Sequence, residues 1–249
     1  MASRITRIAP DGKTSTFLEN SNGSNGLGFT ATGDLISVQT TKAGVGVIYP
    51  ASRAKTLVED FEGTPLNRPN DLVVARNGGI YFTDPGVRAE PGQPAPKTAV
   101  YYRAPSGKVL RIATDIERPN GIQLSPDEKV LYIANTAGEH VLAYDIATDG
   151  SVGSRRNFAK LAGYRQTENG WSSGADGLVV DAQGRLYVAS SAGIQVFTSQ
   201  GKALGIIALP KAPQNLAFAG TDKRTLYAVG RGSAYRVATL TQGHAGRAK

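Results

Sequence analysis

The sequence of 249 residues contains no cysteine and only two histidines, His140 and His244. Without cysteine the chain can form no disulfide, no zinc–thiolate site and no cysteine nucleophile. The scarcity of histidine also argues against a zinc site built on imidazole ligands. Any metal bound by this chain would therefore be held mainly by oxygen atoms, which are the ligands that hard divalent cations prefer.

Long apolar runs and helical periodicity are also absent. No stretch of about 18 apolar residues is present, so we expect no transmembrane helix and no membrane partner. Residues 1–8 lack the apolar core of a signal peptide. The compartment stays open, and a periplasmic or secreted origin remains an alternative if an N-terminal segment was removed. Because no apolar period of 3.6 residues has useful length, we expect almost no helix.

Positive charge predominates in the sequence, but Lys and Arg do not form long runs. The chain has 28 Lys and Arg against 20 Asp and Glu, which gives a net charge of +8. These cations are scattered, and no nucleic-acid-binding motif accompanies them. We therefore expect a solvated basic surface and no nucleic-acid partner.

A polar head followed by a strand, a turn and a second strand recurs along the chain. The five heads lie 39 to 56 residues apart and begin at Asn25, Asn70, Asn120, Asp176 and Asn215. In the copy that starts at Asp176, alternating apolar residues and Gly turns predict a four-stranded meander. Four strands per repeat of this length are typical of β-propeller blades. We therefore expect one all-β propeller domain over residues 1–249.

The two ends of the chain depart from this repeat. Residues 4–18 predict only two strands, and the last copy predicts three. The prediction is a six-bladed β-propeller whose first blade is incomplete. Two alternatives are a closed five-bladed ring and completion by a neighbouring chain, which would make a homo-oligomer.

The register of the repeat predicts where the heads meet. The first strand of each propeller blade lines the central channel, so Asn25, Asn70, Asn120, Asp176 and Asn215 are expected at one end of the axis. Amide oxygens with one carboxylate suit a hard divalent cation, most of all Ca²⁺. The alternative is that these side chains only satisfy backbone groups of turns.

Several motifs carry a resemblance to a known family. They are Arg68-Pro69-Asn70-Asp71 with Tyr81–Pro85, Arg118–Ile122 with Ser125-Pro126-Asp127, and Ala175–Leu178 with Gly193–Phe197. In this order they resemble the gluconolactonase, senescence marker protein and luciferin-regenerating enzyme family, from about residue 4 to the C-terminus. The resemblance implies a six-bladed propeller with one divalent cation, often Ca²⁺, in its channel. It also implies a small-molecule lactone substrate.

The same resemblance implies roles for individual residues. Asn120 and Asp176 match metal ligands, and Asp176 also matches the general base that activates water. Asn70 matches a channel residue near metal and substrate, and Arg68 matches an arginine that contacts the substrate. The family's Glu-Gly-Pro-like motif, which supplies a further ligand, is missing from this sequence. We therefore expect weaker metal binding than in an intact site of the family, with Asn25 as a partial substitute.

Two functions follow from these observations. The first is a metal-dependent hydrolase of sugar-type lactones, and the second is a binding scaffold that has lost catalysis along with the missing ligand. Trp171, in the insertion over residues 163–175, either caps the substrate pocket or packs its own loop. A second insertion, over residues 86–98, is expected to be a loop. Asp84 ends a strand before a proline, which favours a structural role in the turn.

Overall fold

The computed structural model describes residues 3–87, 93–94 and 97–246, and regular structure in these ranges is almost entirely β-strand. The single helical element in the described ranges is a short 3₁₀ helix, η1 (Ala51–Arg53). The prediction of an all-β chain is confirmed. Across the described residues, no helix is long and apolar enough to cross a membrane.

Four sheets contain four antiparallel strands each. The first two comprise β3 (Ser24–Phe29), β4 (Leu35–Gln39), β5 (Gly44–Tyr49) and β6 (Lys55–Val58), then β9 (Leu72–Val74), β10 (Ile80–Asp84), β11 (Ala99–Arg103) and β12 (Val109–Ala113). The next two comprise β13 (Pro119–Leu124), β14 (Val130–Asn135), β15 (His140–Asp145) and β16 (Arg156–Lys160), then β19 (Leu178–Val180), β20 (Leu186–Ser190), β21 (Gly193–Phe197) and β22 (Ala203–Ile207). Within each sheet the strands follow chain order, as in a meander.

The remaining sheets are smaller. A three-stranded sheet comprises β23 (Asn215–Ala219), β24 (Thr225–Gly230) and β25 (Ser233–Ala238), and a two-stranded sheet comprises β1 (Arg4–Ile8) and β2 (Thr14–Glu19). Two short hairpins are formed by β7 (Asp60–Phe61) with β8 (Thr64–Pro65), and by β17 (Arg165–Thr167) with β18 (Gly170–Ser172). The predicted set of four full blades, one three-stranded blade and one two-stranded fragment is confirmed.

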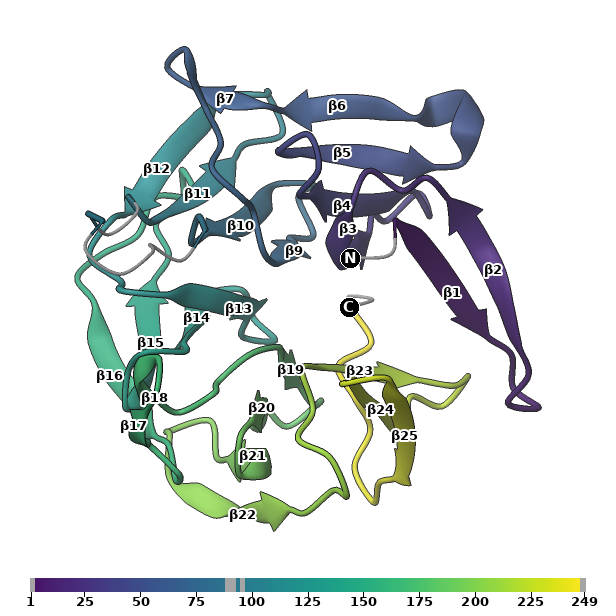
Figure 1. Cartoon of the computed structure of the whole chain (residues 1–249), viewed down its shortest axis with the longest axis vertical. Coiled ribbons are helices and arrows are strands. Elements are labelled where there is room, and N and C mark those ends of the chain that lie inside the picture. Colours follow the sequence, from purple (N-terminus) through teal and green to yellow (C-terminus); the bar gives the residue numbers. More distant parts are fainter. Residues whose placement is uncertain (1–2, 88–92, 95–96, 247–249) are drawn as a thin grey trace.

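The five larger sheets surround a central axis, with β3, β9, β13, β19 and β23 innermost (Figure 1). The fold is therefore a β-propeller, and its five blades agree with the five-bladed alternative of the prediction. The β1–β2 sheet lies between the β3–β6 and β23–β25 blades (Figure 1). It has only two strands at the place where a sixth blade would stand.

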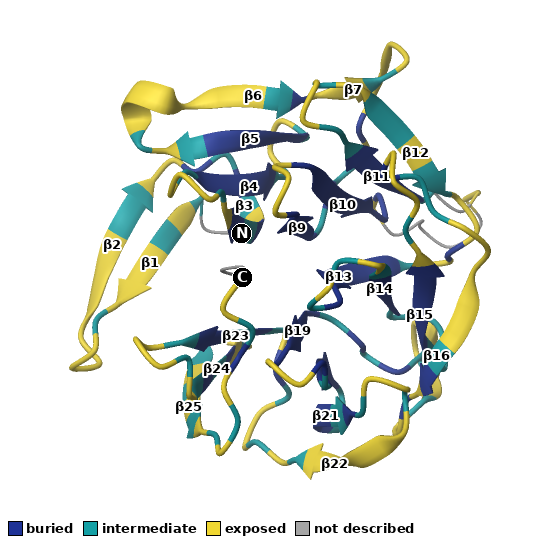
Figure 2. Ribbon diagram, turned by 180° about the vertical axis from the view of Figure 1, so that it is seen from behind, coloured by how far each residue is buried: buried dark blue, intermediate teal, exposed yellow. Residues whose placement is uncertain are grey.

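Apolar side chains from adjacent blades form the core. One cluster joins the β3–β6 and β9–β12 blades through residues such as Val38 and Phe82, and three further clusters join the following pairs. The inner strands β9, β13 and β19 are buried, and β3 and β23 are buried in part, whereas β1, β2 and the outer strand β22 are largely exposed (Figure 2). Burial between blades therefore fixes the inner strands, whose beginnings carry the polar heads.

An apolar cleft of about 580 Å³ lies beside the two-stranded sheet. Its lining includes Ile5, Phe17, Leu27, Phe29 and Phe218, from β1, β2, β3 and β23. The β1–β2 sheet has two strands where each complete blade has four. A homo-oligomer that forms through this sheet stays a prediction.

The last described residues run back along the β19–β22 blade. Gly243 forms an isolated bridge with Asp181, and the Ala182 N–H donates to the Gln242 carbonyl at 2.8 Å. The buried Asp181 carboxylate accepts hydrogen bonds from Arg185 Nε at 2.6 Å and from Thr241 Oγ1 at 3.3 Å. We call residues 241–244 the C-terminal strap.

The two predicted insertions differ in outcome. In the insertion over residues 163–175, expected to be a loop, the β17–β18 hairpin forms, because Thr167 and Gly170 pair around a tight turn. Of the insertion over residues 86–98, residues 88–92 and 95–96 lie outside the described residues.

Candidate active site

A cavity of about 740 Å³ opens at the end of the axis where the innermost strands begin. We call it the upper mouth. All five polar heads of the repeat line it, namely Asn25, Asn70, Asn120, Asp176 and Asn215. Arg118 and Gln214 line it as well. Because the repeat places one head at the start of each inner strand, five positions far apart in the sequence meet in one cavity.

Glycine after the polar head permits this close approach. A side chain at Gly121 would collide with the backbone carbonyl of Asp176, and one at Gly177 would collide with the Asn215 side chain. Glycine has no Cβ, so neighbouring inner strands can pack at this separation. The Asn-Gly and Asp-Gly pairs thus bring the heads of successive blades together.

Asn120 is the most informative of these heads. Its side chain is buried, and its Nδ2 donates to Thr136 Oγ1 at 2.9 Å. Its Oδ1 is buried with no hydrogen-bond partner among the described residues. A buried amide oxygen without a partner loses its interaction with water and gains nothing in return. It is therefore suited to receive a cation or a donor from a bound molecule.

Asp176 supplies the carboxylate of the upper mouth. It is half-buried, and its backbone N–H donates to the Ala189 carbonyl on β20 at 2.9 Å. The next backbone unit pairs in the same way, since the Ala189 N–H donates to the Gly177 carbonyl at 2.9 Å. The β20 strand therefore fixes the backbone from which this carboxylate extends.

Side chains at the ends of the second strands hold the loops before the heads. The buried Asp84 carboxylate accepts the backbone N–H groups of Arg68 at 2.7 Å and Asn67 at 2.8 Å. One repeat later, Asn135 Oδ1 accepts the Arg118 N–H at 3.1 Å. The structural role expected for Asp84 is confirmed, and its hydrogen bonds fix the approach to Asn70.

Some polar heads serve the backbone. Asn215 Oδ1 accepts the Leu216 N–H at 2.8 Å, as the structural alternative expects. Asp71, the residue after Asn70, is buried and accepts the Leu72 N–H at 2.9 Å and the Ile122 N–H at 3.3 Å. These two side chains secure the inner strands, so their oxygen atoms already accept backbone hydrogen bonds.

Arg68 and Trp171 are not among the described residues that line the upper mouth. Trp171 is 54% exposed on the β17–β18 hairpin, and its ring stacks on Tyr164 with centroids 5.1 Å apart. Their contacts with substrate stay predictions. Arg118, which does line the cavity, was missed by the sequence analysis. The repeated Arg-Pro-Asn motif at residues 68–70 and 118–120 was the signal that could have found it.

The donor set fits a hard cation. The upper mouth offers amide oxygens and the carboxylate of Asp176, and the described residues contain no cluster of three His, Cys, Asp or Glu side chains. Ca²⁺ accepts amide and carboxylate oxygens together with water. The unpartnered Asn120 Oδ1, in the same cavity as the Asp176 carboxylate, therefore meets the chemical requirement, with few formal negative charges.

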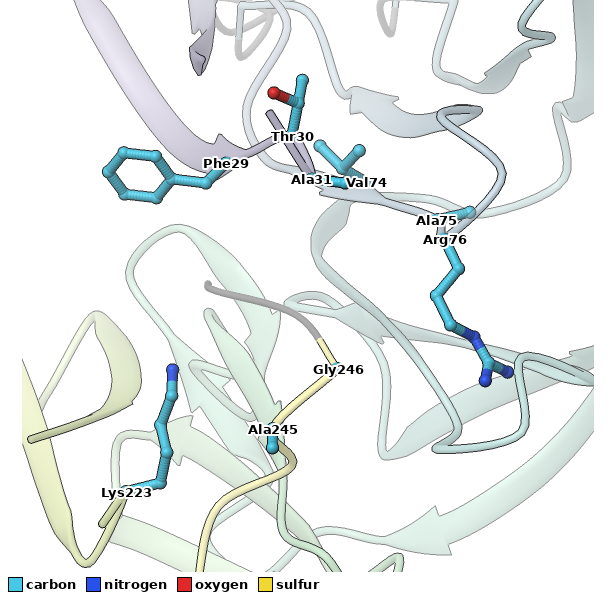
Figure 3. A pocket seen from close by; sticks show the side chains of 9 residues that line it. All are labelled: Phe29, Thr30, Ala31, Val74, Ala75, Arg76, Lys223, Ala245 and Gly246. Carbon is cyan, nitrogen blue, oxygen red and sulfur yellow. The ribbon is translucent and has the colours of Figure 1, made fainter. Parts of the chain in front are cut away.

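The opposite end of the axis has different chemistry. A cavity of about 260 Å³ there is lined by Phe29, Thr30, Ala31, Val74, Ala75, Arg76, Lys223, Ala245 and Gly246 (Figure 3). Its charged lining side chains among the described residues are the cations Arg76 and Lys223. Among the described residues that line it, this lower mouth offers no carboxylate or side-chain amide oxygen to a cation, so the candidate site is the upper mouth.

Comparisons with known proteins identify the family of this chain. Residues 1–230 match the family described as the SMP-30/gluconolactonase/LRE-like region. A gluconolactonase from Zymomonas mobilis is 30% identical over 233 residues, which cover 89% of this chain and 64% of that protein. The chain spans about half or less of the length of two other lactonases that it matches.

Solved structures give the same result. A gluconolactonase from Xanthomonas campestris is 30% identical, with a TM-score of 0.81 over 95% of this chain and 79% of that one. Regucalcin from Agrobacterium tumefaciens, a calcium-binding protein, is 19% identical with a TM-score of 0.78 over 97% of this chain and 84% of that one, which shows the fold alone. Since the family match covers nearly the whole propeller, the chain belongs to the SMP-30/gluconolactonase/LRE-like family.

Proposed function

We propose that this protein hydrolyses sugar-type lactones at the upper mouth with the help of one divalent cation, Ca²⁺ by preference. The observation that carries the proposal is the buried, unpartnered Asn120 Oδ1 in the same cavity as the Asp176 carboxylate. The lactonases among the relatives support the choice of substrate.

The residues that would hold the cation are Asn120, Asp176, Asn70 and Asn25, through amide and carboxylate oxygens. A divalent cation bound there would polarise the lactone carbonyl and stabilise negative charge on its oxygen. The cavity of about 740 Å³ lies in the size range of small-molecule sites, about 300 to 1,000 Å³. A single sugar ring and several water molecules fit such a volume.

Asp176 acts as the general base in this proposal. Its carboxylate accepts a proton from water, and the water oxygen attacks the carbonyl carbon of the lactone. The bond from that carbon to the ring oxygen then breaks, and the ring oxygen takes the proton from Asp176 to become a hydroxyl group, which restores the carboxylate. The product is the open-chain hydroxy acid. Asn70, Arg68 and Trp171 are proposed to contact the substrate, and Arg118 lies in position to do so.

The test measures the rate of glucono-δ-lactone hydrolysis with added Ca²⁺, monitored through the acid that the reaction releases. Asp176→Asn keeps the shape of the side chain but removes the base, so we expect the rate to fall roughly 10²- to 10⁴-fold. Asp11→Asn, on the exposed turn between β1 and β2, is the matched control and should leave the rate unchanged. An unchanged rate in the Asp176→Asn protein would contradict the proposal.

A second candidate is a binding scaffold without turnover. The observation that favours it is the donor set, in which Asp176 is the one carboxylate among the described residues that line the upper mouth. This candidate predicts that calorimetry detects binding of Ca²⁺ or a lactone while lactone hydrolysis stays at the uncatalysed rate.

A further inference from the structure

Thr136, directly after β14, links Asn120 to the segment before β19 that carries Asp176. Its Oγ1 lies 2.9 Å from Asn120 Nδ2 and 2.6 Å from the Ala175 carbonyl oxygen. Ala175 directly precedes Asp176 and is fully buried. One hydroxyl group therefore contacts both of the blades that supply the principal proposed ligands.

The hydrogen-bond chemistry of this link fixes the orientation of the Asn120 amide. A carbonyl oxygen can only accept, so the single hydroxyl proton of Thr136 must point at Ala175. The Thr136 oxygen then has only lone pairs to offer Asn120, and the amide must turn its NH₂ group towards it. The amide oxygen, Oδ1, consequently points away from Thr136, where it is buried without a partner.

The backbone holds Thr136 in place for this task. Its N–H donates to the Arg118 carbonyl at 3.1 Å, and its own carbonyl accepts from the Ser173 N–H at 3.0 Å. Ser172 Oγ also donates to that carbonyl at 3.1 Å. The hydroxyl group is therefore set by the segments on both sides of it and has little freedom to turn away from Asn120.

The matching position in the preceding blade lacks this device. The strand pairs Ile80–Phe82 and Leu131–Ile133 occupy the same place in the repeat, which makes Pro85 the counterpart of Thr136. Proline has neither a hydroxyl group nor a backbone N–H. In that blade the hydroxyl of Thr83 serves the backbone instead, since it accepts the Asp71 N–H at 3.2 Å and donates to the Asn120 carbonyl at 2.7 Å. A hydroxyl that orients the head's side chain is thus a feature of the blade that carries Asn120.

We propose that Thr136 is a positioning residue that orients the Asn120 amide oxygen towards the cation and couples Asn120 to the segment that carries Asp176. This inference rests on the proposed function, because it assigns the orientation a role in cation binding. Partners of this kind in the outer shell of a metal site contribute roughly 10- to 100-fold to metal affinity.

The test is calorimetric titration of the whole protein with Ca²⁺ in the absence of substrate. Thr136→Val keeps the shape but removes both hydrogen bonds, and we expect its affinity to fall about 10-fold or more. Thr136→Ser retains the hydroxyl and should stay within about threefold of the wild type. Thr98→Val is the matched control, since Thr98 Oγ1 also donates to a backbone carbonyl, that of Ile116, but outside the upper mouth.

A readout of activity separates positioning from general destabilisation. The lactonase rate lost in Thr136→Val should return at saturating Ca²⁺, whereas damage to the fold would not be repaired in this way. If Thr136→Val does not fold, Thr136→Ala replaces it in the same titration. If the wild type binds Ca²⁺ and the folded Thr136 variant binds it with the same affinity, this inference alone is overturned. Absence of Ca²⁺ binding by the wild type would overturn the cation of the proposed function and this inference together.

Discussion

The β9–β12 and β13–β16 blades begin with the same three residues, Arg-Pro-Asn, yet the two motifs lie in different surroundings. Before Asn70, a buried carboxylate from Asp84 accepts two backbone N–H groups. Before Asn120, one amide oxygen from Asn135 accepts a single N–H group. The first loop is therefore secured by charge-assisted hydrogen bonds, which are stronger than the neutral bond of the second.

For the side chains of the two asparagines the order is reversed, because Asn120 is held more firmly than Asn70. Asn120 is buried and its amide is oriented by Thr136, whereas Asn70 is half-buried and its blade has Pro85 at the matching position. One motif thus has a firmly held backbone, and the other has a firmly held side chain. Identity of sequence between repeats gives equal places in the fold, while the neighbours at the ends of the second strands decide what each copy can do.

The largest expected difference between the two motifs is in cation binding. Asn120→Ala removes the buried, unpartnered oxygen, so Ca²⁺ affinity should fall on the order of 100-fold, whereas Asn70→Ala should cost about 10-fold. Calorimetric titration of both variants measures the contrast. Equal losses would show that the two asparagines contribute alike and would remove the asymmetry proposed for the site.

The next effect is on stability, and here the loop before Asn70 should matter more than the loop before Asn120. Asp84→Ala leaves the Arg68 and Asn67 N–H groups without their acceptor, so the free energy of unfolding should fall by about 2–3 kcal/mol. Asn135→Ala removes one neutral acceptor and should cost about 1 kcal/mol. Urea unfolding of the two variants gives the comparison, and a larger loss in Asn135→Ala would contradict it.

A smaller effect is expected at the junction between the two blades. The Tyr81 hydroxyl on β10 donates to the Gly150 carbonyl of the next blade at 3.1 Å. Tyr81→Phe should therefore lower the free energy of unfolding by about 1 kcal/mol. Tyr49→Phe, at a tyrosine that is 46% exposed, serves as the control and should be close to neutral. Equal effects in the two variants would mean that this hydrogen bond does not join the blades measurably.

The smallest expected effect concerns alkaline pH. Burial, followed by repulsion from Tyr102, Glu128 and Asp149, raises the pKa of Tyr81 above its ordinary value. A raised pKa means that folding favours the neutral phenol. The contribution of Tyr81 to the free energy of unfolding is therefore complete below about pH 10 and is lost as the pH rises further. Urea unfolding between about pH 8 and 11 should therefore show a shallower alkaline loss in Tyr81→Phe than in the wild type. Parallel curves would contradict this assignment.

The repeat made most of the fold predictable. Period-two apolar patterns and Gly turns predicted the blades, including the three-stranded and two-stranded sheets, because these signals are local. The same register predicted that Asn25, Asn70, Asn120 and Asp176 would meet, since each stands at the start of an inner strand.

Other parts of the site depended on contacts that no local pattern carries. The repeated Arg-Pro-Asn motif marks Arg68 and Arg118 alike, and only the neighbours of each loop in the fold decide that Arg118 lines the cavity. The head at Asn215 looks like the others in sequence, but its oxygen accepts a hydrogen bond from Leu216. Thr136 belongs to no motif, and its role follows only from two hydrogen bonds between blades.

The C-terminal strap has a consequence for the order in which the molecule assembles. Its Thr241 hydroxyl reaches the Asp181 carboxylate across 60 residues of chain, and the loop between them contains the whole β23–β25 blade. Closing so long a loop costs conformational entropy, which is regained only after the intervening strands have formed. The strap is therefore expected to dock late in folding, and once docked it holds together the two ends of a segment that includes the β23–β25 blade.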